Sequence, residues 1–225
     1  MELRSIDLFE PVAVPATATR SGIPLAYDPT FKRLLDVLLA GIGLVLTLPI
    51  WLAVAIAIKL ESRGPVFFIQ ERVGYRGRRF QFLKFRSMYE NAEAGLQHLL
   101  SANEASGPVF KIRNDPRITR VGKLIRKTSL DELPQLINVL RGEMSLVGPR
   151  PPIARETESY RPADHERFLV KPGLTCLWQV RGRSDVDFDT WMEYDREYVY
   201  GMSLLTDVRI MVGTFQAVVS GRGAY

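Results

Sequence analysis

Residues 128–152 read TSLDELPQLINVLRGEMSLVGPRPP, and the interpretation of the whole chain starts from this stretch. Two adjacent carboxylates, Asp131 and Glu132, precede an apolar pattern with leucine or isoleucine at positions 133, 136, 137 and 140. That spacing predicts one face of a helix, and Gly142 stands where a left-handed C-cap is expected. We therefore expect the acidic pair, Asp131 and Glu132, at the positive end of a helix, where free N–H groups and the macrodipole favour anions.

The acidic pair allows two interpretations. Ser129 and Glu132 fit the S-x-x-E capping box, which needs no chemistry. Pro134 would then be the fifth helical residue and remove a backbone donor, whereas with Asp131 as the N-cap it falls in the first turn, where the loss costs little. Basic residues surround the pair: Arg117, Arg120, Lys123, Arg126 and Lys127 before it, and Arg141 and Arg150 after it. Two carboxylates among so many cations favour a metal-bridged phosphate site.

Length and composition limit the possible classes of function but do not identify one. A chain of 225 residues predicts one domain with appendages. The net charge of +5 suits nucleic acid, anionic lipid or a phosphate-bearing substrate. A single cysteine, Cys176, excludes an internal disulfide and a cysteine-based zinc site. With two histidines in the chain, a metal ion would bind oxygen ligands, and magnesium is the expected ion.

The N-terminal part contains the one long apolar run. Residues 1–30 are proline-rich and are therefore expected to form a mostly irregular tail. They are not expected to be a signal peptide, because acidic residues interrupt them and no apolar core follows the start. Residues 37–58 carry no charged side chain, and a straight helix over them would reach about 33 Å at ~1.5 Å per residue, enough for a bilayer core of ~30 Å. A buried helix of a soluble protein is the alternative. Pro49, near the middle, predicts a kink that leaves each half too short to cross.

Charges at the two ends of the run predict its topology. They are Lys32 and Arg33 before the run, and Lys59 and Arg63 after it. The positive-inside tendency puts both ends on the cytoplasmic face. We therefore expect residues 31–63 to form a re-entrant membrane helix that is broken at Pro49, and favour this topology over a single span. Asp36, near the entry, is either a snorkelling surface residue or a partner for Arg33.

Residues 64–225 are expected to form the catalytic domain. Strands are predicted over residues 66–70 and 80–85, with Gly74 and Gly77 in the turn between them. Lys84 and Arg86 alternate around Phe85, so they share a strand face that could meet a phosphate or a carboxylate; an ordinary hairpin with a basic loop is the alternative. Helices are predicted over residues 88–101, 121–127 and 153–170.

Three further stretches carry candidate residues. The sequence DPRITR, residues 115–120, presents Arg117 and Arg120 after an Asp-Pro turn. In GPRPP, Pro149 and Pro151 fix the backbone around Arg150 and so lower the entropy of presenting its guanidinium. Residues 171–183, KPGLTCLWQVRGR, are interpreted as a loop, a short strand and a basic turn that contains Arg181, with Cys176 and Trp178 in the core.

The C-terminal stretch, residues 187–219, has tryptophan and tyrosine among charges and then becomes apolar. It suits a helix in a membrane interface and equally a packed terminal helix.

The order of four motifs resembles a known family. They are KFRSM, DPRITR, RKTSLDELPQLINVLRGEMSLVGPRP and KPGLTCLWQVRGR. Together they closely resemble the bacterial sugar transferases, the monotopic phosphoglycosyl transferases that start exopolysaccharide, capsule and O-antigen assembly. The resemblance runs from about Phe31 to the C-terminus, where SGRGAY is similar to members that use undecaprenyl phosphate and UDP-galactose or UDP-glucose.

This resemblance implies a reaction and a site. A sugar 1-phosphate would pass from a UDP-sugar to undecaprenyl phosphate with release of UMP, through a covalent phosphosugar-aspartate. Asp131 matches the nucleophile and Glu132 the neighbour that binds magnesium, with Asp131 beside the ion. Lys84, Arg120 and Arg150 match basic positions near the phosphates. Arg86, Arg117 and Arg181 are added from the sequence as further candidate phosphate- or substrate-binding residues. A helix N-terminus is expected to lower the pKa of such an aspartate.

The resemblance also implies a fold and a location. The fold is a small α/β domain (α+β, mostly helical) on the cytosolic side of a re-entrant helix, with amphipathic helices in the membrane interface. The location is the cytoplasmic face of the bacterial inner membrane, with the bilayer as a partner and no nucleic acid. One departure is the helix break, commonly Ser-Pro in the family and here Leu48-Pro49. Two other functions remain as alternatives: a membrane-bound phosphohydrolase, and a basic adaptor that binds anionic lipid or nucleic acid.

Overall fold

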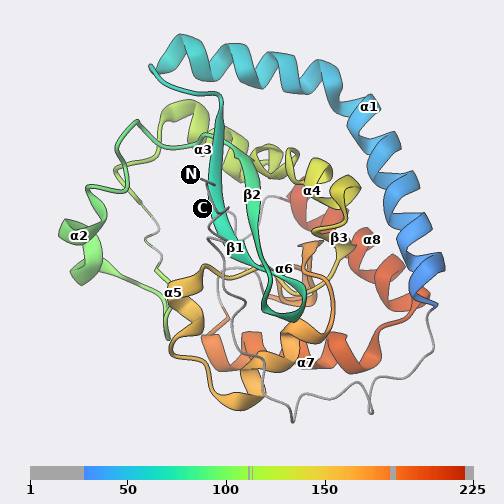
Figure 1. Cartoon of the computed structure of the whole chain (residues 1–225). Coiled ribbons are helices and arrows are strands. Elements are labelled where there is room, and N and C mark those ends of the chain that lie inside the picture. Colours follow the sequence, from blue (N-terminus) through green and yellow to red (C-terminus); the bar gives the residue numbers. More distant parts are fainter. Residues whose placement is uncertain (1–27, 111, 113, 183–185, 221–225) are drawn as a thin grey trace, which may run out of the picture.

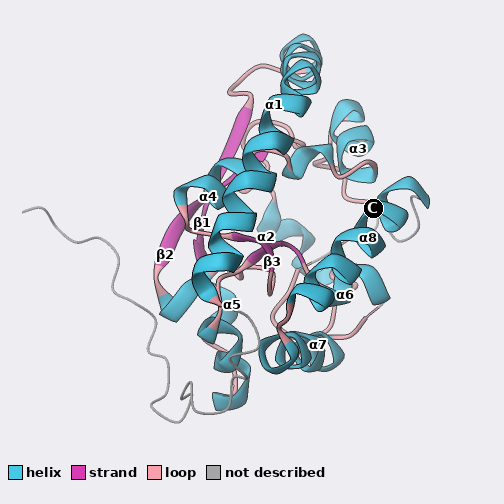
Figure 2. Ribbon diagram, turned by 90° about the vertical axis from the view of Figure 1, so that its right-hand side faces the viewer, coloured by secondary structure: helices cyan, strands magenta, loops and turns pink. Residues whose placement is uncertain are grey.

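The computed structural model describes residues 28–110, 112, 114–182 and 186–220, so the expected tail over residues 1–30 lies almost wholly outside them. The α-helices and strands are α1 (Pro29–Glu61), β1 (Phe67–Val73), β2 (Arg79–Phe85), α2 (Leu96–Leu99), α3 (Arg120–Lys127), α4 (Gln135–Arg141), β3 (Ser145–Val147), α5 (Ala154–Thr157), β4 (Gly173–Thr175), α6 (Leu177–Arg181), α7 (Phe188–Gly201) and α8 (Leu204–Ser220). Short 3₁₀ segments are η2 (Tyr75–Gly77), η3 (Leu100–Ala102), η4 (Leu130–Glu132) and η5 (Pro162–Leu169). The predicted class, mostly helical with small sheets, is confirmed (Figure 2).

Helix α1 is the predicted apolar helix. The Asp28 side chain accepts hydrogen bonds from the backbone N–H groups of Thr30 (2.6 Å) and Phe31 (3.3 Å), and Pro29 occupies the first turn, where its missing N–H is harmless. The helix runs for 33 residues to Glu61. By length and composition it is the one helix within the described residues that could cross a membrane.

The expected break at Pro49 takes the form of a bend within one continuous helix (Figure 1). Proline removes one backbone hydrogen bond. In the turn before it, the Thr47 hydroxyl donates to the Gly43 carbonyl at 2.7 Å and accepts the Trp51 indole N–H at 3.2 Å. A threonine whose hydroxyl donates to the carbonyl four residues earlier often accompanies a bend in a helix. Thr47 thus supplies a hydroxyl near the bend that Leu48 lacks.

The inner side of the bent α1 belongs to the core. Ala40 packs in a cluster with Phe82 of β2 and with Leu136, Val139 and Met144, which lie in or after α4. Further along α1, Val54 and Ile58 pack against Phe85 and Ile125. Asp36 is also buried, but it pairs with Lys32 at 2.8 Å and accepts the Leu146 N–H at 3.1 Å, so neither role considered for it from the sequence holds.

The first sheet is the predicted hairpin. Strands β1 and β2 pair antiparallel, with Arg72 opposite Phe80 and Phe68 opposite Lys84. Gly77 adopts φ 74° in the turn, a conformation that glycine reaches without strain.

The helix predicted over residues 88–101 is wrong for most of its length, because only Leu96–Leu99 is α-helical. Asn91, with φ 64°, and the turns around it interrupt that pattern, and no residue of α2 is buried.

The second sheet joins β3 and β4 in parallel, with Ser145 opposite Gly173 and Val147 opposite Thr175. The backbones approach closely here, since a Cβ on Gly173 would lie 2.1 Å from the Gly148 nitrogen.

The helix predicted over residues 153–170 is instead the short α5 followed by η5, which begins at Pro162. The basic turn expected around Arg181 is helix α6.

Helices α6, α7 and α8 pack together against the second sheet. Val147 of β3 packs with Leu177, Tyr198, Val199 and Ile210, which come from these three helices. Cys176 is buried, as expected. The stretch over residues 187–219 therefore forms two helices, and α8 buries Ile210 while it exposes apolar side chains on its other side.

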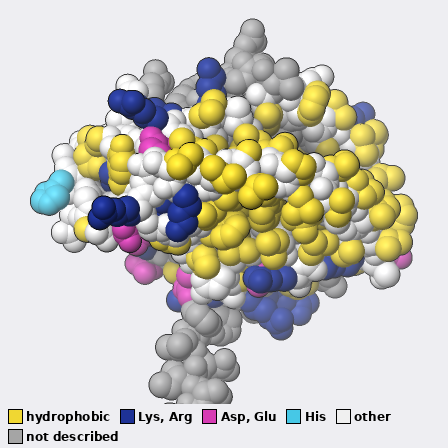
Figure 3. Space-filling model, turned by 90° about the horizontal axis from the view of Figure 1, so that it is seen from above, with side chains coloured by type: hydrophobic (Ala, Val, Ile, Leu, Met, Phe, Trp, Pro, Cys, Tyr) yellow, Lys and Arg dark blue, Asp and Glu magenta, His cyan; other side chains and the backbone are white. Residues whose placement is uncertain are grey.

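Exposed apolar side chains gather on α1 and α8, and we call this surface the apolar face. Its large members are Phe31, Leu34, Val37, Leu38, Leu39, Ile42, Val45, Leu46, Leu48, Ile50, Leu52, Ile56 and Leu60 of α1, and Leu204, Leu205, Val208, Val212 and Phe215 of α8. The view from above shows a broad hydrophobic surface with basic side chains towards its margins (Figure 3). A surface this apolar marks a contact with membrane or protein.

Candidate active site

The acidic pair lies in a tight turn between α3 and α4. Ser129, with φ 55°, adopts a left-handed conformation that reverses the chain after α3. The N–H of Glu132 donates to the Ser129 carbonyl at 3.2 Å, which closes the 3₁₀ segment η4. A non-glycine residue in this region costs about 1–2 kcal/mol and is often found near functional sites.

The capping-box interpretation of Ser129 and Glu132 is wrong. The Ser129 side chain makes no cap hydrogen bond in the described structure, and α4 begins only at Gln135, after Pro134. Asp131 and Glu132 therefore precede the helix by one 3₁₀ turn. Pro134 fits because it stands at the start of α4, where its nitrogen has no helical bond to make. Gly142, with φ 84°, ends α4 as predicted.

Two cations converge on Glu132. Its Oε1 lies 3.0 Å from Lys84 Nζ and 2.7 Å from Arg150 Nη2. Lys84 Nζ is also 3.5 Å from Asp131 Oδ2, so the lysine bridges the two carboxylates. Asp131 is only 5% exposed. The site thus brings one buried carboxylate, a second carboxylate and two cations within a few ångströms of one another.

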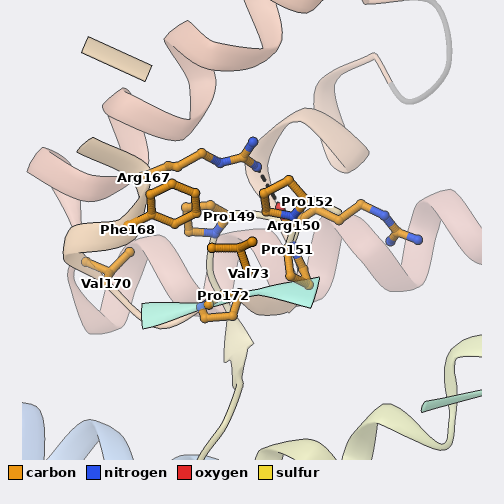
Figure 4. A pocket seen from close by; sticks show the side chains of 10 residues that line it. Val73, Pro149, Arg150, Pro151, Pro152, Arg167, Phe168, Val170 and Pro172 are labelled. Atoms are coloured by element: carbon orange, nitrogen blue, oxygen red, sulfur yellow. Dashed lines mark hydrogen bonds between the residues drawn. The ribbon is translucent and has the colours of Figure 1, made fainter. Parts of the chain in front are cut away.

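The backbone of Arg150 is fixed by its neighbours. Pro149 and Pro151 flank it, and Arg167 Nη2 donates to the Arg150 carbonyl at 2.6 Å. Figure 4 shows this bond and the Arg150 side chain extending away from the prolines. Arg167 is itself buried beside Asp195, with a 2.8 Å charge contact that lacks hydrogen-bond geometry. The sequence predicted the rigid proline turn, but not Arg167.

The two carboxylates differ in their proton affinity. Burial raises the pKa of Glu132, but the charges of Arg150 and Lys84 outweigh burial and hold the pKa well below its usual value. The pKa of Asp131 is raised, because burial and the charge of Glu132 together exceed the opposing effect of Lys84. The expectation that a helix N-terminus lowers the pKa of this aspartate is wrong, since η4 and not a helix start surrounds it. Additional positive charge near Asp131 would favour its ionised form.

A cavity of about 1240 Å³ opens beside the acidic pair. Its polar wall includes Arg72, Lys84, Arg126 and Arg150. Its apolar wall includes Leu133, Leu146, Leu174, Trp178, Trp191, Met211, Phe215 and Val218. The volume exceeds the usual range of ligand pockets and leaves room for a large or two-part substrate.

Four of the predicted basic residues lie elsewhere. Arg86 is buried and donates to the Ser62 carbonyl at 3.0 Å and to the Arg63 carbonyl, which ties the end of α1 to β2. Arg117 pairs with Asp115 at 2.6 Å, two residues before it. Arg120 is exposed at the start of α3, and Arg181 pairs with Glu197 at 2.5 Å on the surface. Of the six predicted cations, the structure brings Lys84 and Arg150 to the acidic pair.

Two cavity arginines were not among the six candidate binding residues, although Arg126 was noted from the sequence as one of the basic residues around the acidic pair. Arg126 extends from α3 and donates its Nε–H to Ser87 Oγ at 2.8 Å. Arg72 extends from β1 on the face it shares with Lys84, since directly paired residues point to one side of a hairpin. The position of Gly74 and Gly77 fixes that register, so the hairpin pattern itself carried a signal for Arg72.

The acidic pair fits a hard cation in part. Carboxylate oxygens are the ligands that magnesium prefers. Among the described residues, no group of three or more Asp, Glu, His or Cys side chains is close enough to form a site from protein ligands alone. Magnesium commonly takes one or two carboxylates and completes its shell with substrate phosphates and water. Asp131 and Glu132 fit that kind of site.

Comparison with known proteins identifies the family. The family model described as bacterial sugar transferase matches residues 27–221. The chain belongs to the bacterial sugar transferase family. It is therefore an enzyme of the transferase class.

Individual members support this assignment. The exopolysaccharide production protein ExoY of Sinorhizobium fredii is 43% identical over 198 residues, which cover 86% of this chain and 88% of that protein. The undecaprenyl-phosphate galactose phosphotransferase of Salmonella typhimurium is 43% identical over 202 residues, 86% of this chain but 41% of that protein. The undecaprenyl-phosphate glucose phosphotransferase of Komagataeibacter xylinus is 38% identical over 233 residues, 98% of this chain and 41% of that protein. The sugar transferase chain thus spans most of ExoY and less than half of the other two.

Proposed function

We propose that this sugar transferase moves a sugar 1-phosphate from a UDP-hexose, galactose or glucose, to undecaprenyl phosphate and releases UMP, as the first step of exopolysaccharide, capsule or O-antigen assembly. The names of the Salmonella and Komagataeibacter relatives support the lipid acceptor and the two candidate sugars. The observation that carries the chemistry is the placement of Asp131. It is a buried carboxylate 3.5 Å from Lys84, at the wall of a cavity that four cations line.

Asp131 is the proposed nucleophile. Its carboxylate oxygen forms a bond to the phosphorus that carries the sugar, while the bond from that phosphorus to the bridging oxygen breaks. The electron pair goes to the bridging oxygen, which leaves as part of UMP. An oxygen of the lipid phosphate then bonds to the same phosphorus, and the electron pair of the Asp131–phosphorus bond returns to the carboxylate. Each step is a substitution at phosphorus that needs an ionised attacking oxygen and screened phosphate charges.

The neighbouring residues provide that environment. Lys84 lowers the pKa of Asp131 against the effect of burial and so favours the ionised nucleophile. Arg150, held by its 2.7 Å contact with Glu132, places a fork of donors at the cavity wall, where phosphate oxygens suit it. Magnesium, held by Glu132 and Asp131, would neutralise phosphate charge when bound. The roles of Glu132 are therefore to orient the two cations and to offer a metal ligand.

The apolar face provides the route for the lipid substrate. Phe215 of α8 is 72% exposed and also lines the cavity, so the cavity borders the surface that we assign to the membrane. We propose that α1 enters the cytoplasmic leaflet as a re-entrant helix bent at Pro49 and that α8 lies in the interface. The exposed apolar side chains of both helices would then contact lipid tails, and the lipid phosphate would reach Asp131 from the headgroup level.

The test is a defined reaction. Purified protein is incubated with undecaprenyl phosphate, magnesium and a panel of UDP-sugars, and UMP is measured. We expect UMP release that depends on the lipid phosphate beyond a first turnover and is greatest with UDP-galactose or UDP-glucose. Labelled sugar phosphate should be trapped on Asp131 when the lipid is omitted, and Asp131→Asn should trap none.

Two results would overturn the proposal. Sustained UMP release without lipid phosphate would instead show a phosphohydrolase. Full activity in Asp131→Asn would remove this carboxylate from the reaction. Exposed Arg181 provides a control, since Arg181→Gln removes a surface ion pair with Glu197 and should leave the reaction unchanged.

A further inference from the structure

Arg72 is an unpaired cation in the wall of the cavity. It leaves β1 on the same hairpin face as Lys84, and its guanidinium lies 5.3 Å from the centre of the Phe82 ring. Its Nη1 donates to the Pro151 carbonyl at 3.0 Å. Its Nε is buried and has no hydrogen-bond partner among the described residues. Nor does Arg72 form an ion pair with any carboxylate in the described part of the chain.

This arrangement is costly unless an anion joins it. Burial lowers the pKa of Arg72 to about 10, and the charge of Arg150 acts in the same direction, while the charges of Glu156 and Glu132 oppose both. A buried charge without a directly paired counter-ion destabilises a fold. Lys84 and Arg150 already share Glu132. Arg72 lines the cavity without a directly paired carboxylate, so its charge is available to an anionic ligand there, and a guanidinium suits a phosphate.

Arg72 and Lys84 both lie against the Phe82 ring on one face of the hairpin, 5.3 Å and 5.6 Å from its centre. Lys84, which contacts Asp131, pairs with Phe68, whereas Arg72 pairs with Phe80, nearer the hairpin turn. Arg126 comes from α3, which leads into the Asp131 turn. Arg72 comes from the hairpin and bonds to Pro151, next to Arg150. Arg126 thus comes from the helix that leads into the nucleophile, whereas Arg72 lies further along the hairpin face from Asp131 than Lys84 does.

The geometry of phosphoryl transfer predicts which groups bind on the side of the reacting phosphorus opposite Asp131. Attacking and leaving oxygens lie roughly in line with the phosphorus between them. If Asp131 attacks from one side, the phosphate of UMP leaves on the other. The lipid phosphate must later attack from that same other side, because it displaces Asp131. One anion subsite therefore serves the departing phosphate in the first step and the arriving phosphate in the second.

We propose that Arg72 forms this shared subsite and binds the phosphate monoester opposite Asp131, first that of UMP and then that of the lipid. The proposal rests on the proposed function. In the first step Arg72 faces the oxygen that gains the electron pair of the broken phosphorus–oxygen bond. In the second step it holds the lipid phosphate whose oxygen forms the new bond while Asp131 regains its electron pair. Arg72 remains protonated throughout.

Binding of UMP alone provides the first test. UMP should raise the melting temperature of the wild-type protein in detergent, and the UMP dissociation constant should rise about 100-fold in Arg72→Met. Arg72→Lys keeps a charge without the planar fork and should give an intermediate value. Arg78→Met removes an exposed arginine of the same hairpin outside the cavity and should bind UMP as the wild type does. If Arg72→Met does not fold, Arg72→Lys decides the question.

The two half-reactions provide the second test. Exchange of labelled UMP into the UDP-sugar reports the first step without lipid. Discharge of trapped sugar phosphate by undecaprenyl phosphate reports the second. Both rates should fall by about 100-fold in Arg72→Met. Wild-type UMP affinity in this variant, or loss of one half-reaction alone, would overturn the shared subsite.

The outcome separates the two proposals. If the wild-type protein forms no adduct on Asp131, the proposed function fails whatever Arg72 does. If the wild-type adduct forms and Arg72→Met binds UMP and reacts normally in both steps, the proposed function stands and the role of Arg72 is refuted.

Discussion

Lys32 of α1 forms a 2.9 Å ion pair with Asp207 of α8. The pair joins the first and last described helices, which together carry the apolar face, and Lys32 also contacts Asp36 at 2.8 Å. Tyr198 donates to Asp207 at 2.9 Å from α7. One lysine thus neutralises two buried carboxylates directly beneath a surface assigned to lipid.

Removal of this lysine should destabilise the protein. Lys32→Met leaves Asp36 and Asp207 buried without their cation, and loss of one partner of a buried pair costs about 3–5 kcal/mol. The measurement is denaturant unfolding in detergent micelles. Lys59→Met, at the exposed end of α1, removes a single 2.8 Å bond to the Gly64 carbonyl and should cost less than about 1 kcal/mol. Equal stability of the two variants would contradict the role of Lys32.

The pH dependence of adduct formation should report the charge of Lys84. Lys84 lowers the pKa of Asp131, so its removal raises that pKa further. Because attack needs the ionised carboxylate, the acid limb of kcat/KM for the UDP-sugar should move to higher pH in Lys84→Met. Arg79→Met removes another cation of β2, paired with Glu71 outside the cavity, and should leave the limb in place. An unchanged limb in Lys84→Met would show that Lys84 does not set this ionisation.

Asp195 should make stability fall as the solution becomes less acidic. Burial raises its pKa to about 6 from an ordinary value of 3.8, against the opposing charge of Arg167. Between these two values the folded state keeps a proton that the unfolded state has lost, so the free energy of unfolding decreases as pH rises from about 4 to about 6. The decrease is up to about 3 kcal/mol.

The matched variant is Asp195→Asn. It carries no titratable group at this position, so its unfolding free energy should lack this part of the decrease. Urea unfolding of both proteins at several values between pH 4 and pH 7 measures the difference. Parallel curves would mean that Asp195 is ionised throughout.

The bend at Pro49 should decide the topology of α1. Pro49→Ala restores a backbone donor to the middle of the helix and should straighten it. A straight helix of 33 residues is long enough to span the bilayer. A tag at the N-terminus should be on the cytoplasmic side in the wild type and partly on the opposite side in Pro49→Ala, as protease digestion of spheroplasts would show. A wild-type tag on the opposite side would refute the re-entrant topology.

Local patterns predicted the elements that depend on neighbouring residues. The apolar spacing after Glu132, the glycine at position 142 and the Gly74–Gly77 turn all specify backbone conformation over a few residues, and α4, its C-cap and the hairpin are present. The prolines around Arg150 likewise predicted how that side chain is presented. The acidic pair was placed correctly between basic segments, although Ser129 bends the chain in a way that the sequence pattern did not indicate.

Contacts between distant segments could not be predicted in this way. In the sequence, Arg86 and Arg117 are basic residues in candidate motifs just as Lys84 and Arg150 are. In the structure, backbone carbonyls at the end of α1 bind Arg86, and Asp115 binds Arg117. Arg72 and Arg167 gain their positions from Pro151 and Arg150, about 80 and 17 residues away in the chain. A charged residue becomes part of a site only when no closer partner neutralises it, and that depends on the complete fold.

The participation of α1 in the core has a practical consequence for anyone producing this enzyme. Ala40, Val54 and Ile58 fill the same clusters as Phe82, Phe85 and Leu136, so the helix is no detachable tether. A truncated form starting after Arg63 would leave those clusters open to water and deprive Arg86 of the two carbonyls that bind it. The protein should therefore be produced as the intact chain, with detergent or a nanodisc to cover the apolar face of α1 and α8.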